Sequence, residues 1–294
     1  MKVTVGIPAY NEEANIGKIL EAILSQELVK GISISEIIVA ADGCTDRTVE
    51  IVKEYQQKNN LIKLLYQDKR LGLTFAVNNI LKNAKGDILI MTCADTIPTK
   101  KVVSYLVSPF FNEKNIGAVV GRAVPVNDPN TMWSYIGHLF FKWNYSPDFL
   151  MVDFEAMTAM RKDLLEPIPP NTGISNERYL HKVITDKGFK VIHAPNAIVY
   201  SKFPDNLKDF ISQRRRNLFR HMQMKRLGMD VPHISPAKGA MVVLKSLTLN
   251  PKKMFWLNVA VLLTFYCYIL AWLDNIMGKS HAKWEMTEST KKVE

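Results

Sequence analysis

The chain has 294 residues, of which 22% are charged and 10% aromatic, a composition typical of folded proteins and not of disordered ones. The net charge of +10 is uneven, because 12 Lys and Arg stand against only 3 Asp between Lys202 and Lys253, which leaves the remainder close to neutral. Cys44, Cys93 and Cys267 stand far apart and fit neither a metal-binding spacing nor a disulfide framework, which indicates a reduced, cytosolic catalytic part.

The N-terminal third alternates short apolar strands with helices. The predicted strands are Lys2–Pro8, Glu36–Ala41, Lys63–Tyr66 and Ile88–Thr92, and the predicted helices between them are Ile16–Leu24, Arg47–Gln57 and Leu73–Leu81. The last of these strands has no polar alternation, as in a strand buried on both faces of a parallel sheet. Short loops between alternating strands and helices predict an α/β fold with a doubly wound, mostly parallel sheet.

The pattern changes after Pro98 to a less regular mixture of helices and strands. The predicted elements are a helix at Lys100–Phe111, a strand at Gly117–Gly121, an irregular aromatic stretch at Trp133–Phe154, a helix at Ser175–Lys187, a strand at Lys190–His193 and a helix at Asn206–Arg226. The last helix carries apolar residues among its arginines, a pattern typical of helices that lie on a membrane surface.

A long apolar segment follows the basic region. Met254–Leu273 contains no charged residue over 20 positions, which is long enough for a helix that crosses a bilayer. The alternative is a buried core helix. Because this segment adjoins the basic region, we expect an anionic membrane and not a nucleic acid as partner, with the basic residues on the cytosolic side. The nearly neutral tail, Asp274–Glu294, is then expected on the opposite side.

Two acids stand at the carboxyl ends of predicted strands, where open α/β sheets bind their ligands. Asp42 follows the second strand and Asp95 follows the fourth. The sequence has no Gly-x-Gly-x-x-Gly after the first strand and no Walker-type loop, so a nucleotide would be held differently. Carboxylates suit ribose hydroxyls and a divalent cation that bridges a diphosphate. The alternatives are that Asp95 caps the helix near Lys100 and that Asp42 is a turn acid before Gly43.

Five short motifs extend these observations. They are Val5-Gly6-Ile7-Pro8-Ala9-Tyr10-Asn11-Glu12, Ala41-Asp42-Gly43-Cys44-Thr45-Asp46-Arg47-Thr48, Cys93-Ala94-Asp95-Thr96, Ser175-Asn176-Glu177-Arg178-Tyr179-Leu180 and Gln213-Arg214-Arg215-Arg216-Asn217. In this order they resemble motifs of the family-two glycosyltransferases, the large inverting group with the GT-A fold. The last resembles the Gln-x-x-Arg-Trp signature of membrane-bound members such as cellulose and hyaluronan synthases. The resemblance runs from about Lys2 to His221 and covers most of the chain.

The resemblance implies roles for particular residues. The nucleotide-sugar site would comprise Pro8, Ala9, Tyr10, Glu12, Asp42, Gly72, Ala94 and Asp95. Asp95 would also hold Mg²⁺ or Mn²⁺ on the diphosphate, and Glu177 would deprotonate the acceptor hydroxyl. Gln213 and Arg216 would face the acceptor path and the leaving diphosphate.

Three positions depart from the family pattern. Cys93 replaces the first acid of the Asp-x-Asp motif, and a thiol is a poor ligand for a hard cation such as Mg²⁺. Asn176-Glu177 keeps one acid of the usual pair, as Glu in place of Asp. Asn217 replaces the Trp of the processive signature, which argues against action on a growing polymer.

These features predict four regions: a GT-A domain at 1–205, a basic membrane-interface region at 206–250, a transmembrane helix at 251–275 and a polar tail at 276–294. The predicted activity is inverting transfer from a nucleotide sugar to a lipid-linked or polysaccharide hydroxyl at the cytosolic face of the cell membrane, in a single-pass protein. One alternative is a nucleotidyltransferase, although the Gly-rich, Arg-containing loop expected after its first strand is missing. The other is a membrane scaffold derived from a glycosyltransferase, which Cys93 favours and the retained acids oppose.

Overall fold

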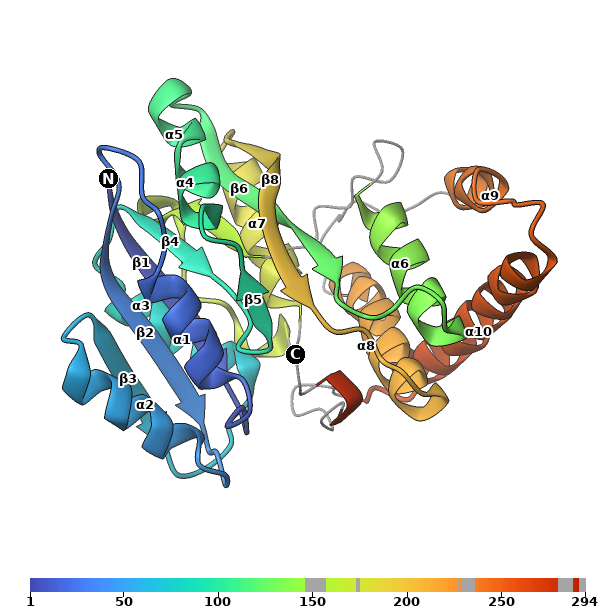
Figure 1. Ribbon diagram of the computed structural model, residues 1–294, viewed down its shortest axis with the longest axis horizontal. Coiled ribbons are helices and arrows are strands. Elements are labelled where there is room, and N and C mark those ends of the chain that lie inside the picture. Colours follow the sequence, from blue (N-terminus) through green and yellow to red (C-terminus); the bar gives the residue numbers. More distant parts are fainter. Residues whose placement is uncertain (146–156, 173–174, 227, 229–235, 280–287, 291–294) are drawn as a thin grey trace.

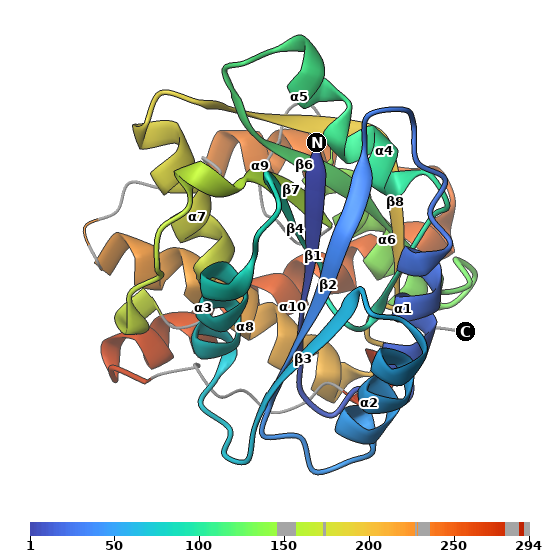
Figure 2. The same cartoon turned by 90° about the vertical axis from the view of Figure 1, so that its left-hand side faces the viewer.

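The computed structural model describes residues 1–145, 157–172, 175–226, 228, 236–279 and 288–290. These residues form an eight-stranded sheet in the order β3-β2-β1-β4-β7-β6-β8-β5, with a group of helices beyond its β6–β8 end (Figure 1). Helices cover both faces of the sheet. Viewed from the β3 side, α1, α2 and α4 lie on one face and α3 and α7 on the other (Figure 2).

The N-terminal half confirms the predicted alternation of strands and helices. Its elements are β1 (Lys2–Ala9), α1 (Ile16–Leu24), β2 (Ser33–Asp42), α2 (Thr48–Lys58), β3 (Ile62–Gln67), α3 (Leu73–Asn83) and β4 (Ile88–Met91). Strands β3, β2, β1 and β4 are all parallel, so their carboxyl ends meet at one edge. Ile88, Leu89 and Ile90 of β4 are buried, as the unbroken run predicts, and Met91 at its end is partly buried.

The second half joins strands of both directions to this parallel core. Its elements are β5 (Thr96–Pro98), α4 (Val102–Val107), α5 (Pro109–Asn112), β6 (Ile116–Pro125), β7 (Thr158–Arg161), α7 (Asn176–Asp186) and β8 (Lys190–Ser201), with short 3₁₀ turns at Lys162–Leu164 and Pro170–Thr172. Strand β7, which the sequence analysis missed, runs antiparallel between β4 and β6. The sheet is therefore mixed at this end, although its ligand-binding edge is parallel.

Two prolines explain the other differences from prediction. Pro109 divides the predicted helix at Lys100–Phe111 into α4 and α5, because it cannot donate the backbone hydrogen bond that would continue the first helix. Strand β8 continues beyond the predicted end at His193, because the register with β6 shifts between His193 and Ile198 and leaves Pro195 outside the ladder.

The stretch predicted as irregular between Trp133 and Phe154 is helical over its described part. Helix α6 (Met132–Asn144) packs through Ile136 and Phe140 against Phe203 and Phe210. The approach is close at Gly137, where a Cβ atom would lie 2.6 Å from the Phe203 ring. The rest of the aromatic stretch lies outside the described residues.

The basic helix and the apolar helix pack side by side. Helix α8 (Leu207–Arg226) lies along α10 (Pro251–Ile276), and α9 (Pro236–Leu244), which comes between them in sequence, lies at the edge of the group (Figure 1). Asp274 of α10 is fully buried and accepts two hydrogen bonds from the Arg215 guanidinium, with Lys279 3.1 Å away. This buried ion pair fixes the relative position of α8 and α10, because separating the partners would leave a buried charge unpaired.

Helix α10 is not a buried core helix. It is long and apolar enough to cross a membrane, and side chains along its outer face, such as Leu262 and Phe265, are 69% and 63% exposed. Of the tail that is expected across the bilayer, the structure describes residues 274–279 and 288–290. The short 3₁₀ turn Glu288–Thr290 lies against α8, where the Ser289 N–H donates to the Asp209 carboxylate. The single-pass topology, with the tail across the bilayer, stays a prediction.

Candidate active site

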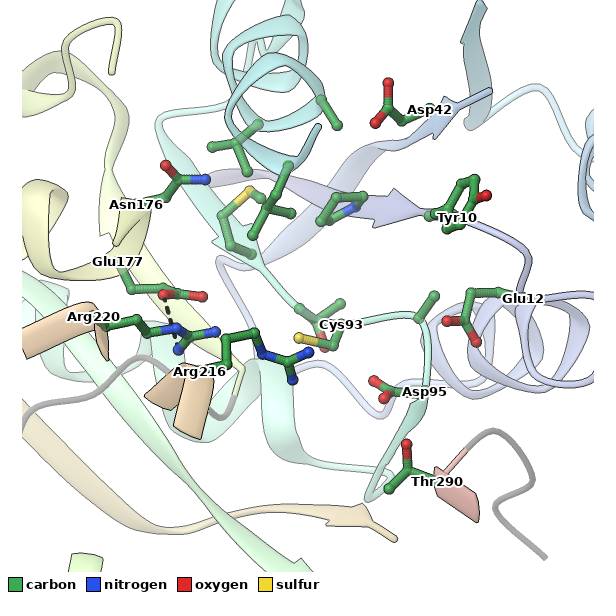
Figure 3. Close-up of a pocket in the computed structure, with 18 of the residues that line it drawn as sticks. Tyr10, Glu12, Asp42, Cys93, Asp95, Asn176, Glu177, Arg216, Arg220 and Thr290 are labelled. Atoms are coloured by element: carbon green, nitrogen blue, oxygen red, sulfur yellow. Dashed lines mark ion pairs between the residues drawn. The ribbon is translucent and has the colours of Figure 1, made fainter. Parts of the chain in front are cut away.

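A cavity of about 230 Å³ opens at the carboxyl edge of the parallel strands (Figure 3). All but one of the sequence-predicted site residues line it: Pro8, Ala9, Tyr10, Glu12, Asp42, Ala94, Asp95, Glu177, Gln213 and Arg216. Tyr10 and Asp42 lie at one end, Cys93 and Asp95 near the middle, and Glu177 at the other end (Figure 3). The exception is Gly72, which does not line the cavity.

Asp42 organises the loop that leads into α3. Its carboxylate accepts hydrogen bonds from the backbone N–H groups of Leu71 at 2.8 Å and Gly72 at 2.6 Å, and from the side chain of Gln67. Gly72 therefore contributes through its backbone. The next residue, Gly43, has a positive φ of 67°, and a Cβ atom there would lie 2.3 Å from the backbone nitrogen of Arg70. Only glycine fits this crossing of two loops.

The same loop brings a cation into the cavity that the sequence analysis missed. The Arg70 guanidinium stacks on the ring of Tyr10 at 3.8 Å from the centroid, a cation–π contact that fixes both side chains. Arg70 stands two residues before the helix-starting glycine, Gly72. The sequence does contain a signal from which Arg70 could have been predicted, since it is a basic residue in a loop next to a predicted nucleotide site.

The loop after β1 is fixed by hydrogen bonds to the loop after β2. The Glu12 N–H donates to the Thr48 hydroxyl at 2.7 Å, and the Asn15 side chain donates to the Glu12 carboxylate at 3.2 Å. Asn11, the one non-glycine residue with positive φ among those described, accepts a hydrogen bond from the Thr45 N–H at 2.8 Å. The two loops therefore hold Tyr10 and Glu12 at the cavity wall.

Asp95 is positioned by a compact turn at the end of β4 and does not cap a helix. The Thr96 hydroxyl lies 3.1 Å from that of Thr92 and donates to the carbonyl of Cys93 at 2.8 Å. Helix α4 begins after Lys101, six residues beyond Asp95, so the capping alternative is wrong. The Asp95 carboxylate lines the cavity instead.

The Cys93 thiol stays protonated near neutral pH. The thiol is accessible from the cavity, which protein surrounds. This burial, together with the carboxylates of Asp95 and Glu177, raises the pKa of the thiol far above its ordinary value. A neutral thiol does not ligate a hard divalent cation. Asp95 is then the carboxylate of this motif that remains available.

Helices α7 and α8 form the opposite wall. Glu177 lies in the first turn of α7, and its carboxylate pairs with the Arg220 guanidinium at 3.6 Å (Figure 3). Gln213, Arg216 and Arg220 follow one another at helical spacing along α8, and all line the cavity. Arg220 was missed by the sequence analysis. Arg220 could have been predicted from its position one helical turn after Arg216, which places both residues on the same face of α8.

Comparison of the sequence with known protein families identifies the family of this chain. Residues 4–168 match the family model described as Glycosyl transferase family 2, which is more than half of the chain. The chain belongs to glycosyl transferase family 2. The chain therefore carries the family's glycosyltransferase domain, and the nucleotidyltransferase alternative does not agree with this family.

Curated family members show moderate similarity. The probable glycosyltransferase YdaM of Bacillus subtilis is 28% identical over 73% of this chain and 54% of that protein, so the chain spans about half its length. A dolichyl N-acetyl-α-D-glucosaminyl phosphate diacetamido-dideoxy-glucuronosyltransferase of Methanococcus voltae is 24% identical over 72% of this chain and 70% of its own. The poly-β-1,6-N-acetyl-D-glucosamine synthase of Staphylococcus aureus is 30% identical over 41% of this chain and 28% of its own.

Solved structures confirm the GT-A fold of this family-two enzyme. The mannosyltransferase PcManGT of Pyrobaculum calidifontis, solved with GDP-Man and Mn²⁺, has a TM-score of 0.66 at 20% identity and covers 95% of this chain and 88% of its own. Residues 1–349 of S. aureus TarS have a TM-score of 0.51 at 16% identity, covering 95% of this chain and 92% of that chain.

A second cavity of about 180 Å³ adjoins the first in this glycosyltransferase. The two share Cys93, Asp95, Glu177, Gln213, Arg216 and Arg220. The second adds a ring of aromatic side chains from Phe140, Phe141, Phe203 and Phe210, and two cations, Lys202 and Arg214. Asn217, which stands in place of the family's Trp, also lines it. Glu177 thus lies where the two cavities meet.

We expect Asp42→Asn to weaken binding of UDP or GDP at least about tenfold, measured by titration calorimetry. The amide has one acceptor oxygen for the backbone donors that the carboxylate now satisfies, and a lost hydrogen bond to a charged group costs about 1.5–3 kcal/mol. The loop that carries Arg70 would then move. Asp68→Asn, an exposed acid in the same loop, should leave affinity unchanged. Unchanged affinity in Asp42→Asn as well would contradict this role.

Proposed function

We propose that the enzyme transfers a sugar from a nucleoside diphosphate to an acceptor hydroxyl with inversion at the anomeric carbon. The observation that carries the proposal is the position of Glu177, whose side chain lines both cavities. A donor in the first cavity and an acceptor in the second would meet at this carboxylate. A hydroxyl that loses its proton to Glu177 and attacks the anomeric carbon directly, opposite the leaving diphosphate, gives inversion.

The nucleoside would lie at the Tyr10 end of the first cavity. The stacked Tyr10 and Arg70 offer a flat, positively charged surface, and the loop that Asp42 organises closes this end. Glu12 is held beside them by its hydrogen bonds and faces the same space. Gly72 would act indirectly, by donating its N–H to Asp42.

The diphosphate would lie between Asp95 and α8. The Arg216 guanidinium faces this part of the cavity (Figure 3) and would oppose the charge that develops on the leaving group, while Gln213 offers an amide donor one turn earlier. Arg220 would orient the Glu177 carboxylate through their ion pair. Three side chains on one face of α8 therefore serve the leaving group and the base together.

The donor set near Asp95 fits a divalent cation that is shared with the substrate. The described residues contain no group of three or more His, Cys, Asp or Glu side chains that could hold a metal ion. Mg²⁺ is commonly bound by one or two carboxylates together with substrate phosphates, and Asp95 supplies such a carboxylate. We propose that Asp95 holds Mg²⁺ or Mn²⁺, which when bound neutralises charge on the diphosphate. The PcManGT structure and a structure of glucosyl-3-phosphoglycerate synthase from Mycobacterium tuberculosis are both complexes with Mn²⁺.

The second cavity supports an acceptor that is both anionic and apolar. Lys202 and Arg214 supply positive charge, and the Arg214 guanidinium lies 4.2 Å from the centroid of the Phe140 ring. An acceptor with a phosphate and an apolar part, such as a lipid-linked phosphate or a glycan begun on one, satisfies both features. The names of the Methanococcus and Staphylococcus relatives describe a dolichyl phosphate acceptor and a polysaccharide product.

The helices beside the acceptor cavity support attachment to a membrane. Helices α9 and α10, with the loop between them, expose a run of large apolar side chains: Met241, Leu244, Leu247, Leu249, Phe255, Leu262, Phe265, Ile269, Trp272 and Ile276. Exposed lysines at 245, 252 and 253 flank them, as expected for a helix that meets anionic headgroups. We propose that this face enters the cytosolic leaflet with α10 in the plane of the membrane, because α8 covers its other side and residues 288–290 return to the catalytic domain.

We expect Asp95→Asn to abolish the stimulation by Mn²⁺ and to lower kcat/KM by about 10²–10³, because the leaving diphosphate loses its cation. Calorimetric titration of UDP and GDP, with Mn²⁺ and with EDTA, separates the metal effect from catalysis. Asp163→Asn, an exposed acid in a 3₁₀ turn, serves as the matched control. If Asp95→Asn still binds nucleotide more tightly with Mn²⁺, Asp95 is not the metal ligand.

Glu177→Gln should lower kcat by about 10²–10⁴ while the affinity for the donor changes little, because the amide keeps the shape but cannot accept the proton. Pre-steady-state turnover and donor titration measure the two quantities. Asp186→Asn, at the exposed end of the same helix, should behave as wild type. Near-normal turnover in Glu177→Gln excludes it as the base. A wild-type protein that binds donor but transfers to no hydroxyl would instead support the scaffold alternative.

Full-length protein should float with vesicles of phosphatidylcholine and phosphatidylglycerol, and Phe265→Glu should reduce this binding at least about tenfold, because a charge on the inserted face opposes burial in lipid. Leu28→Glu, exposed far from α10, is the control. A C-terminal tag should be cut by protease in inside-out membrane vesicles from a bacterial host. Cleavage only in right-side-out vesicles would establish the single-pass arrangement, and a protein that stays soluble at low salt would refute membrane attachment.

A further inference from the structure

Asn176 presents a buried polar group to the donor cavity. It is the first residue of α7, is only 2% exposed, and lies beside Glu177 in the cavity wall (Figure 3). Its Oδ1 atom accepts a hydrogen bond from the Thr74 hydroxyl at 2.9 Å, which leaves Nδ2 on the cavity side. Nδ2 is buried and makes no hydrogen bond within the described protein. Because a buried donor without an acceptor is costly, this position indicates a ligand oxygen.

The wall next to Asn176 is apolar. Leu73, Ala76 and Val77 of α3, with Met91, Met160 and Leu180, line the cavity and belong to a single apolar cluster. Leu180 follows Asn176 by one helical turn of α7. Thr74, the hydrogen-bond partner of Asn176, stands in the first turn of α3 between Leu73 and Ala76. The amide donor therefore stands at the border of an apolar compartment.

This compartment lies where the sugar of the donor must be, an assignment that rests on the proposed function. Tyr10, at the nucleoside end, and Asn176 lie on opposite sides of the cavity (Figure 3). The anomeric carbon must come close to a hydroxyl held by Glu177, the neighbour of Asn176. A substituent of the sugar ring then reaches both the Asn176 amide and the apolar wall.

We propose that Asn176 is a specificity-determining residue that recognises an acylamino substituent on the donor sugar. The acyl oxygen would accept the hydrogen bond from Nδ2, and the methyl group would lie against the apolar wall. A hydroxyl in place of the acylamino group would accept the hydrogen bond from Nδ2 but would leave the apolar wall in contact with water. A carboxylate substituent on the sugar would require a cation, and the proposed function already assigns the cavity-lining Arg216 and Arg220 to the diphosphate and to Glu177.

The test compares UDP-N-acetylglucosamine with UDP-glucose, with UDP and GDP alone as references, by calorimetry on the full-length enzyme with Mn²⁺. Wild type should prefer the acylamino sugar by about tenfold or more, since a hydrogen bond and a buried methyl group are both lost with glucose. Asn176→Ala should bring the preference within about threefold while UDP affinity is unchanged. Asn176→Asp, nearly isosteric, should also lose it, because a carboxylate repels the acyl oxygen.

Asn83→Ala, the same change at the exposed end of α3, should keep the preference and controls for the substitution itself. Equal or tighter binding of UDP-glucose by wild type, an unchanged preference in both Asn176 variants, or binding confined to GDP-hexoses would each overturn the inference and leave the proposed function intact. Failure of wild type to bind any nucleotide or nucleotide sugar would refute the proposed function itself.

Discussion

The site depends first on the parallel pairing of β2, β1 and β4. Ala9 pairs with Ala41 and Gly6 with Met91, so the three chains leave the sheet at the same edge, and their next few residues include Tyr10, Asp42 and Asp95. The pairing requires a small residue at position 6, where a Cβ atom would lie 2.5 Å from Ile80 of α3. The loop that Asp42 holds leads directly into α3. The close packing of α3 on β1 therefore also sets the position of this loop at the wall of the cavity.

The second half of the site is supplied by helices whose positions are set outside the sheet. Arg216 and Arg220 reach the cavity from α8, and α8 is held by aromatic packing against α6 and by the buried ion pair between Arg215 and Asp274. Adjacent residues of one helix thus face different neighbours, Arg215 the buried Asp274 of α10 and Arg216 the cavity. A displacement of α10 would be transmitted to the groups around the diphosphate. The proposed membrane contact and the chemistry are therefore mechanically joined through a single helix.

The sequence predicted the parts whose signals are local. Unbroken apolar runs and regular spacing gave the first four strands and three helices, and motif order gave the family and ten of the cavity-lining residues. Strand β7 was missed because its four residues, Thr-Ala-Met-Arg, include only one β-branched side chain and depend on neighbouring strands for their conformation. Helix α6 was missed because its aromatic residues have no clear polar face, and it is ordered by packing on Phe203. Arg70 and Arg220 were missed because their roles arise from partners distant in sequence, Tyr10 and Glu177.

The two departures from the family pattern at Cys93 and Asn176 both change the net charge of the cavity. Each puts a neutral group where the family pattern has an acid, and both line the donor cavity. In the proposed function the cavity accepts a diphosphate, which every carboxylate opposes and every guanidinium favours, and these interactions are strong in a partly enclosed site of low effective dielectric. With Arg70, Arg216 and Arg220 set against Glu12, Asp42, Asp95 and Glu177, two further acids would leave the cavity strongly negative without a bound cation. The neutral replacements bring the protein's own charge close to balance. Under the proposed function, a site built in this way would hold a diphosphate with less help from the metal, and the Asn176 position would be available to select the sugar.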